Sequence, residues 1–349
     1  MIAAFRLAFG NARMRARKSR LRTASAARLL GSAPGVAAFA DSLGLPPTNE
    51  QAELDRILFD RLLDDYRRIL DDYSAARPLV HALLARHEVE NLKLGWRALA
   101  RGLPPSRWIR LWRRFGALET LSLETFRDAS SLAEAVRRAS STPWGRIVRE
   151  TLEAHEHDPA AAELALDVFA FARVAEEAEK LPRREAIARR LVLSLVSERD
   201  LDAFRRATAF SGVSPELAGA ATVRLSRDLP EETLATLAGW TEGALPFDLR
   251  LPAGIIPRSR AIHGWDALRM TIRRERVAAC RRAFAGPPFR LAPAIAFLLL
   301  REAETRALTA LASVLPSLPG RGVGGEGRDH ATAPPSALER VFAASLLGD

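Results

Sequence analysis

The segment Glu90-Asn-Leu-Lys-Leu-Gly-Trp-Arg-Ala98 returns in altered form as Arg199-Asp-Leu-Asp-Ala-Phe-Arg-Arg-Ala207. The alignment pairs Asn91 with Asp200, and each copy continues into a glycine and then a proline next to a serine. A shorter third copy is Glu304-Thr-Arg-Ala-Leu308. Internal similarity at a long period indicates one structural unit used several times. We therefore predict similar helical bundles repeated around a pseudo-symmetric body.

The polar residues of the repeat stand among leucines. A buried polar side chain costs free energy unless it is hydrogen-bonded, and once bonded it fixes how helices align. We interpret Asn91 and Asp200 as residues of this kind, with direct contact to a partner protein as the alternative. Arg97 and Arg206 follow six residues later, about 240° further around an ideal helix. We expect these arginines to pair with a different neighbour.

Composition favours helices throughout. The 349 residues are 48% hydrophobic but only 7% aromatic, and the abundant Ala, Leu, Arg and Glu lose little side-chain freedom in a helix. Apolar residues recur at three- and four-residue spacing between residues 54 and 73, and a second helix near 78–101 ends at Gly102. The longest apolar run, Pro293 to Leu300, is far shorter than the roughly 20 residues that cross a bilayer. The sequence predicts an all-α protein whose membrane association comes through a partner or the surface.

The chain is strongly basic, with 52 Lys and Arg against 42 Asp and Glu, a formal net charge of +10. Such a charge suits a polyanion, an acidic protein surface or an anionic membrane face. Residues 13–22 concentrate it in Arg-Met-Arg-Ala-Arg-Lys-Ser-Arg-Leu-Arg. This segment is interpreted as a solvated helix or as the contact for an acidic partner. A basic helical nucleic-acid-binding protein is the alternative function.

Catalytic chemistry finds little support in the sequence. The single cysteine, Cys280, has no obvious histidine partner. His155-Glu-His-Asp158 lacks a third strong ligand at helical spacing, and Gly320 to Gly327 lacks the Lys-Ser/Thr of a phosphate-binding loop. We expect no enzyme activity, no metal and no cofactor.

The composition changes near the C-terminus. Residues 1–316 are expected to form one all-helical domain built of three repeats. Residues 317–335 are rich in glycine, proline and charge and are typical of a flexible linker. Residues 336–349 are expected to include one short amphipathic helix, either a docking element or without function.

Three segments together resemble the C/d family of V-type ATPase subunits, called C in the bacterial and archaeal enzymes and d in the eukaryotic vacuolar enzyme. They are Asn11-Ala-Arg-Met-Arg-Ala16, Glu90-Asn-Leu-Lys93 with Arg97, and Pro293-Ala-Ile-Ala-Phe-Leu-Leu-Leu-Arg-Glu-Ala-Glu304. The resemblance extends over about residues 5 to 320. It departs from the family pattern at Ala307, where an Asn is usual.

The resemblance implies a fold and a role. The fold would be a funnel-like body of three similar helical bundles in a pseudo-threefold arrangement. The protein would be a non-catalytic central-stalk component that couples the rotating shaft of the soluble ATPase to the membrane proteolipid ring, for proton or sodium-ion transport. Its partners would be the shaft subunits and the ring, without nucleic acid and without a transmembrane span. It would be cytoplasmic and peripheral at the inner face of the cell membrane.

The resemblance and the repeat also mark individual residues. Those expected to have structural roles are Asn91, Lys93, Arg97, Asp200, Arg206, Glu302 and Glu304. Glu302 and Arg306 are spaced for an ion pair on a helix surface. Our hypothesis for partner contact concerns four arginines, which we expect to orient the protein on acidic protein surfaces or lipid headgroups: Arg13, Arg15, Arg17 and Arg22.

Overall fold

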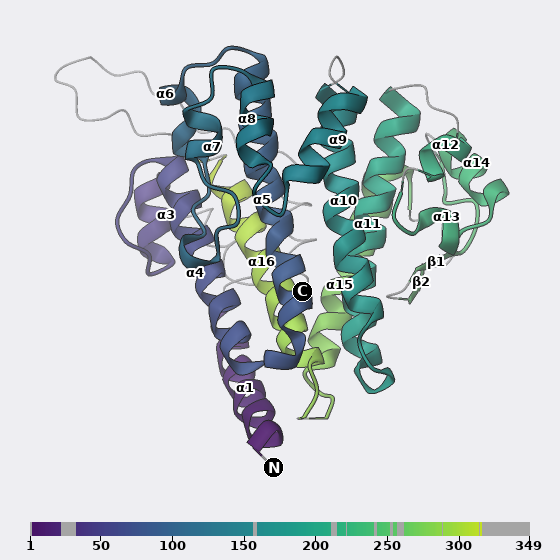
Figure 1. Ribbon diagram of the computed structural model, residues 1–349. Helices are drawn as coiled ribbons and strands as arrows, with labels where there is room; N and C mark the ends of the chain where they lie inside the picture. The colour runs from purple at the N-terminus through teal and green to yellow at the C-terminus, as the bar shows by residue number, and fades with distance from the viewer. Residues whose placement is uncertain are drawn as a thin grey trace.

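The described residues fold mainly into helices, which confirms the all-α prediction (Figure 1). The computed structural model describes residues 2–21, 33–155, 159–210, 215–220, 222–240, 243–251, 254–256, 262–287, 289–313 and 315. Within these ranges two short strands pair in antiparallel fashion, β1 (Leu249–Leu251) and β2 (Gly254–Ile256), with Leu249 opposite Ile256. The linker and helix predicted for residues 317–349 lie outside the described residues.

Long helices of the described chain form three hairpins. They are α4 (Gln51–Asp72) with α5 (Arg77–Ala100), α10 (Pro159–Glu179) with α11 (Ala186–Phe210), and α15 (Gly264–Ala283) with α16 (Ala292–Ala312). Short 3-10 turns connect the first two pairs, η1 (Ser74–Ala76) and η4 (Arg183–Glu185). Helix α5 packs on α10, α11 on α15 and α16 on α4. These contacts close the hairpins into a ring.

The predicted helical stripe forms the core of the first hairpin. The apolar residues of α4 that were expected to face the protein interior are all buried, as is Tyr73 just after the helix. They are Leu54, Ile57, Leu58, Leu62, Tyr66 and Ile69. Helix α5 ends where predicted, because Gly102 takes a positive φ of 60° that favours glycine. Helix α16 carries Pro293 in its first turn, where the missing N–H costs nothing.

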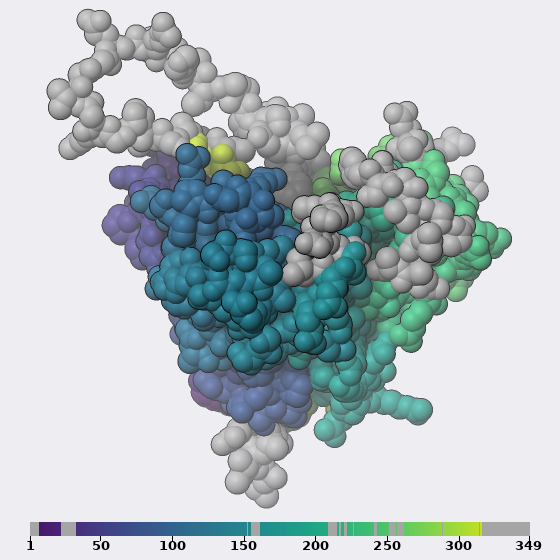
Figure 2. All heavy atoms as spheres, turned by 45° about the horizontal axis from the view of Figure 1, so that its top comes forward, coloured from purple at the N-terminus to yellow at the C-terminus, as the bar shows by residue number. Residues whose placement is uncertain are grey.

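Short helices fill the connections between hairpins. The first cap, between α5 and α10, contains α6 (Pro105–Trp108), η2 (Ile109–Leu111), η3 (Gly116–Leu118), α7 (Glu124–Arg127), α8 (Leu132–Ala139) and α9 (Gly145–His155). The second cap, between α11 and α15, contains α12 (Pro215–Ala220), α13 (Leu225–Asp228), α14 (Glu231–Gly239) and the two strands. Each cap has its own apolar cluster with the end of the helix before it. In Figure 2 the first cap, in blue and teal, and the second, in green, occupy separate regions.

The N-terminal part packs on the hairpin ring. Helix α1 (Ile2–Lys18) contacts α16 and α4, and its Met14 is fully buried in the main core. Asn11 of α1 donates to the carbonyl oxygen of Arg290 (3.0 Å) and accepts from the hydroxyl of Tyr73 (2.8 Å). The small helix α3 (Val36–Ser42) packs on α4. The position of α1 is therefore fixed by both apolar and polar contacts.

Candidate functional site

Asn91 holds the first cap against α5. Its Nδ2 donates to the carbonyl oxygen of Arg113 (2.7 Å), and its Oδ1 accepts from the backbone N–H of the same residue (2.9 Å). The side chain is fully buried, so both of its polar groups are satisfied inside the protein. This geometry favours the register-fixing interpretation over direct contact with a partner.

Asp200 does the same for the second cap. Its carboxylate accepts from the backbone N–H groups of Val223 (3.0 Å) and Arg224 (2.7 Å). Burial raises the pKa of Asp200 to about 6, although the backbone hydrogen bonds oppose that rise. Asn91 and Asp200 each lie 14 residues after the first residue of their helix. The two residues that the sequence alignment pairs therefore occupy the same position along their helices.

A buried carboxylate joins the first hairpin to the second. Asp167 of α10 accepts from Lys93 of α5 (Nζ to Oδ1, 2.9 Å) and pairs with Arg199 of α11. Arg206 approaches the same carboxylate to 3.6 Å. Burial lowers the pKa of Lys93, although the pairing with Glu90 opposes it. We call these side chains, with Asp167 at their centre, the Asp167 cluster.

Arg97 also reaches α10, where it forms an ion pair with Glu163. Arg97 and Arg206 thus both pair with a helix other than the one they stand on, as predicted from their position six residues beyond the repeat polar residues. Asn91 and Asp200 point to the caps, and these arginines point to α10.

A second buried carboxylate joins the second hairpin to the third. Glu198 of α11 binds Arg273 (Nε to Oε1, 2.5 Å) and Arg276 of α15. Burial alone would raise the pKa of Glu198, but Arg276 and Arg273 reverse the effect and lower it. Arg306 of α16 is exposed at the surface. Desolvation by the surrounding protein and repulsion from Arg276 nevertheless lower its pKa to about 10. These residues form the Glu198 cluster.

A third buried carboxylate joins the third hairpin to the first. Glu302 of α16 binds Arg86 of α5 and the hydroxyl of Tyr66 of α4, and His87 lies 3.4 Å from it. Burial alone would raise the pKa of Glu302, but Arg86 and His87 lower it instead. Burial lowers the pKa of His87 to about 4. These residues form the Glu302 cluster.

The predicted surface ion pair of Glu302 with Arg306 was wrong. Glu302 is 3% exposed and its partner is Arg86 on another helix. The local spacing rule concerns neighbours on one helix, whereas Arg86 lies 216 residues earlier in the chain. Glu302 is buried on α16, and its compensating charge therefore comes from Arg86 on the facing helix α5.

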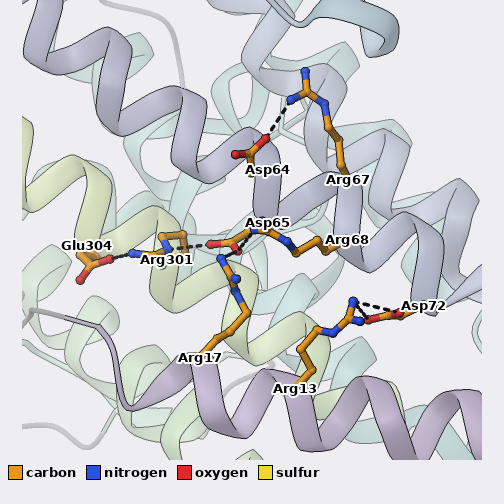
Figure 3. Close-up of polar contacts among 9 residues, drawn as sticks. All are labelled: Arg13, Arg17, Asp64, Asp65, Arg67, Arg68, Asp72, Arg301 and Glu304. Atoms are coloured by element: carbon orange, nitrogen blue, oxygen red, sulfur yellow. Dashed lines mark hydrogen bonds and ion pairs between the residues drawn. The ribbon is translucent and has the colours of Figure 1, made fainter. Parts of the chain in front are cut away.

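The N-terminal arginines bind the protein's own ring (Figure 3). Arg13 pairs with Asp72 (3.1 Å), and Arg17 pairs with the buried Asp65 of α4. Arg15 donates to the backbone carbonyl oxygens of Phe284 (3.0 Å) and Gly286 (3.2 Å). The simple expectation of a solvated segment does not fit these three residues.

Asp65 is the centre of the contacts in Figure 3. Besides Arg17, it binds Arg301 of α16 (2.8 Å) and lies 3.7 Å from Arg68. Arg301 in turn pairs with Glu304, one of the residues expected to have a structural role. The fourth arginine of the partner-contact hypothesis, Arg22, lies outside the described residues.

The central acids of the first two clusters were missed from the sequence. A signal existed for Asp167, because it stands between Leu166 and Val168 in an apolar stretch, as Asn91 stands among leucines. Glu198 gave a weaker signal, since serine and arginine flank it. Neither partner set could be found without knowing which helices face each other.

In the described part of the chain, no group of three or more His, Cys, Asp or Glu side chains is placed to hold a metal ion. Burial raises the pKa of Cys280 to about 12, so its thiol stays protonated. His155-Glu-His-Asp158 lies largely outside the described residues.

Comparison with known proteins identifies a family over most of the length. The sequence model of the ATP synthase (C/AC39) subunit family matches residues 10–314. The search of curated proteins finds no match. Of the helices described, none is both long and apolar enough to cross a membrane.

Proposed function

The chain belongs to the ATP synthase (C/AC39) subunit family, and we propose that it is a non-catalytic central-stalk subunit of a V-type rotary ATPase or ATP synthase. In this role it couples the rotating shaft to the proteolipid ring of the membrane, for transport of protons or sodium ions. It would act at the inner face of the cell membrane, held there by its partners. The body is proposed to be a funnel of three similar bundles, one per hairpin.

The observation that carries this proposal is the set of three junctions between hairpins. Asp167, Glu198 and Glu302 each bind a basic side chain from a neighbouring hairpin of the ring. Buried charge-assisted hydrogen bonds are short and directional, and such pairs specify an arrangement more than they add stability. A subunit that transmits torque needs its parts to keep their relative positions under load. The three junctions supply that resistance to sliding.

The two ends of the ring offer different surfaces to two partners. The short helices of both caps gather toward one end of the hairpins, and the hairpin turns and the start of α1 lie toward the other (Figure 1). We propose that one end receives the shaft and the opposite end rests on the ring. Arg13, whose side chain is 36% exposed, remains available for an acidic partner surface even while it pairs with Asp72.

The first test is co-purification. The tagged protein is recovered from host membranes in mild detergent, and bound proteins are identified by mass spectrometry. Recovery of V-type catalytic subunits together with a proteolipid is the expected result. Recovery of nucleic acid with neither of these, and salt-sensitive DNA or RNA binding by the pure protein, would instead support the nucleic-acid alternative.

A paired substitution then tests coupling itself. Lys93→Met removes one bond to Asp167 at a hairpin junction. Lys180→Met removes a lysine just after α10 that is 57% exposed and, among the described residues, pairs with Glu176 and Glu177 of that helix. We expect the complex that contains the Lys93→Met variant to assemble and hydrolyse ATP. It should transport fewer ions per ATP hydrolysed than the wild-type complex. Lys180→Met should behave as wild type. Equal coupling in both variants, with normal assembly, would contradict a torque-bearing role for the junction.

A further inference from the structure

A cavity of about 730 Å³ lies beside the Asp65 contacts. Its walls are the end of α1, the connection between α3 and α4, and one face each of α4 and α16. This volume lies within the range of small-molecule sites, roughly 300 to 1,000 Å³. The proposed coupling role makes no use of this cavity.

The walls carry an excess of positive charge. Five arginines line the cavity, Arg17, Arg20, Arg61, Arg68 and Arg301, against two carboxylates, Asp64 and Glu304. Asp65 lies behind this wall and Arg67 binds Asp64 from outside it at 2.9 Å. With those two included, six guanidinium groups face three carboxylates. The local field therefore favours an anion.

Several donors are not used up by these carboxylates. Arg20 is exposed and has no acidic partner among the described residues. Arg68 approaches Asp65 only to 3.7 Å, beyond hydrogen-bond distance. The Nε of Arg17 is buried and has no acceptor within the described structure. A buried N–H without an acceptor costs free energy comparable to a lost hydrogen bond, so a bound oxyanion there would be favourable.

We propose that this cavity binds a phosphoryl oxyanion, carried either by a soluble phosphorylated small molecule or by a phospholipid headgroup. Guanidinium groups are planar, always charged and matched to the oxygens of a phosphate. The partial engagement of Arg17 and Arg301 with Asp65 holds both side chains in place before the ligand arrives (Figure 3). The site is polar on its α4 and α1 sides, and Leu43, Leu45 and Leu308 give it an apolar wall for the rest of a ligand.

The soluble form is tested by titration calorimetry of the purified full chain with inorganic pyrophosphate at constant ionic strength. We expect saturable binding that Arg20→Ala weakens by about tenfold, as loss of one charge-assisted hydrogen bond predicts. Asp64→Asn removes a negative charge from the wall and should tighten binding by about twofold. Arg107→Ala, which removes an exposed arginine of α6, is the matched control and should not change affinity.

The lipid form is tested by flotation with phosphatidylcholine vesicles that contain or lack phosphatidic acid. Binding that needs phosphatidic acid and is weakened by Arg20→Ala but not by Arg107→Ala identifies a headgroup as the source, and pyrophosphate binding without flotation identifies a soluble ligand. The proposal is overturned if neither probe binds, or if Arg20→Ala and Arg107→Ala weaken binding equally. Because the pure chain is used, failure of the co-purification experiment would leave this result unaffected.

Discussion

The two caps are attached at the same position of their helices by different chemistry. In the first cap, Asn91 binds both the N–H and the C=O of Arg113. In the second cap, Asp200 accepts from two consecutive N–H groups, those of Val223 and Arg224. An amide suits a residue that presents one donor and one acceptor, whereas a carboxylate suits two donors. The backbone of each cap therefore decides which side chain its helix must carry.

A second pair of aligned positions shows that side-chain volume, like hydrogen bonding, is matched to the cap. Gly95 of α5 aligns with Phe204 of α11. The ring of Phe126, from the first cap, occupies the space beside Gly95, and Phe204 fills the corresponding space of the second cap with its own side chain. The apolar cluster of the first cap takes this aromatic ring from the cap, and that of the second takes it from the helix. Equivalent positions thus need equivalent contacts, and they need not carry the same residue.

The largest expected effect comes from giving the first cap the residue of the second. Asn91→Asp places a carboxylate oxygen against the carbonyl oxygen of Arg113, now 2.7 Å from Nδ2. We expect a loss of about 4 kcal/mol in unfolding free energy at pH 7, because a buried charge is left facing an acceptor. Denaturant unfolding measures the loss, and hydrogen exchange of residues 105–123 locates it in the first cap.

Asn91→Leu is the control for this substitution. It removes both hydrogen bonds of Asn91 without adding charge, so it should lose about half as much. The penalty of Asn91→Asp should also shrink at low pH, since a protonated carboxyl can donate to Arg113 as the amide does. Equal losses for Asp and Leu at every pH would contradict the matching of side chain to cap.

The next largest effect is a pH dependence of stability that comes from Asp200, the residue that holds the second cap. The pKa of Asp200 is raised to about 6 from an ordinary 3.8, so between those values the folded protein holds a proton that the unfolded chain has lost. Stability contributed by this group is therefore full below about pH 4 and declines as pH rises to about 6, by about 3 kcal/mol in all. Asp228, on α13, adds to the raised pKa.

The measurement compares wild type with Asp200→Asn from pH 4 to pH 7. Other carboxyl groups titrate in both proteins, so the difference between the two curves isolates Asp200. As pH rises, we expect the unfolding free energy of wild type to fall relative to that of Asp200→Asn. A difference that is constant with pH would show that Asp200 titrates at its ordinary value.

The smallest of the three effects tests whether the space beside Gly95 is already filled by a ring from the first cap. A Cβ on Gly95 would lie 2.5 Å from the ring of the buried Phe126, so Gly95→Ala should cost about 2 kcal/mol through overpacking. Gly239→Ala in the second cap is the control, because nothing lies within 4 Å of its Cβ position. It should be neutral or stabilise by about 0.5 kcal/mol. Recovery of stability in Gly95→Ala with Phe126→Leu would confirm the source, and no recovery would contradict it.

The sequence predicted what depends on local pattern. The helical class, the stripe of α4, the end of α5 at Gly102 and the polar roles of Asn91 and Asp200 all follow from spacing and residue type. The partners do not, because Arg86 reaches Glu302 only when helices 216 residues apart are packed together. The arginines of α1 were expected to serve a partner, and the sequence contains no sign that α1 lies along Asp65 and Asp72. Their role toward a partner stays a prediction.

The junction between the third hairpin and the first differs from the other two in the order of synthesis. Helices α4 and α5 are translated long before α16, and 236 residues of sequence separate Tyr66 from Glu302. Until the third hairpin emerges, Arg86 lacks its carboxylate partner Glu302, and Asp65 has Arg17 but not yet Arg301. Contacts of such long sequence separation form late. During synthesis the ring therefore cannot close until α16 has emerged, and until then the faces of α4 and α5 that α16 covers stay open.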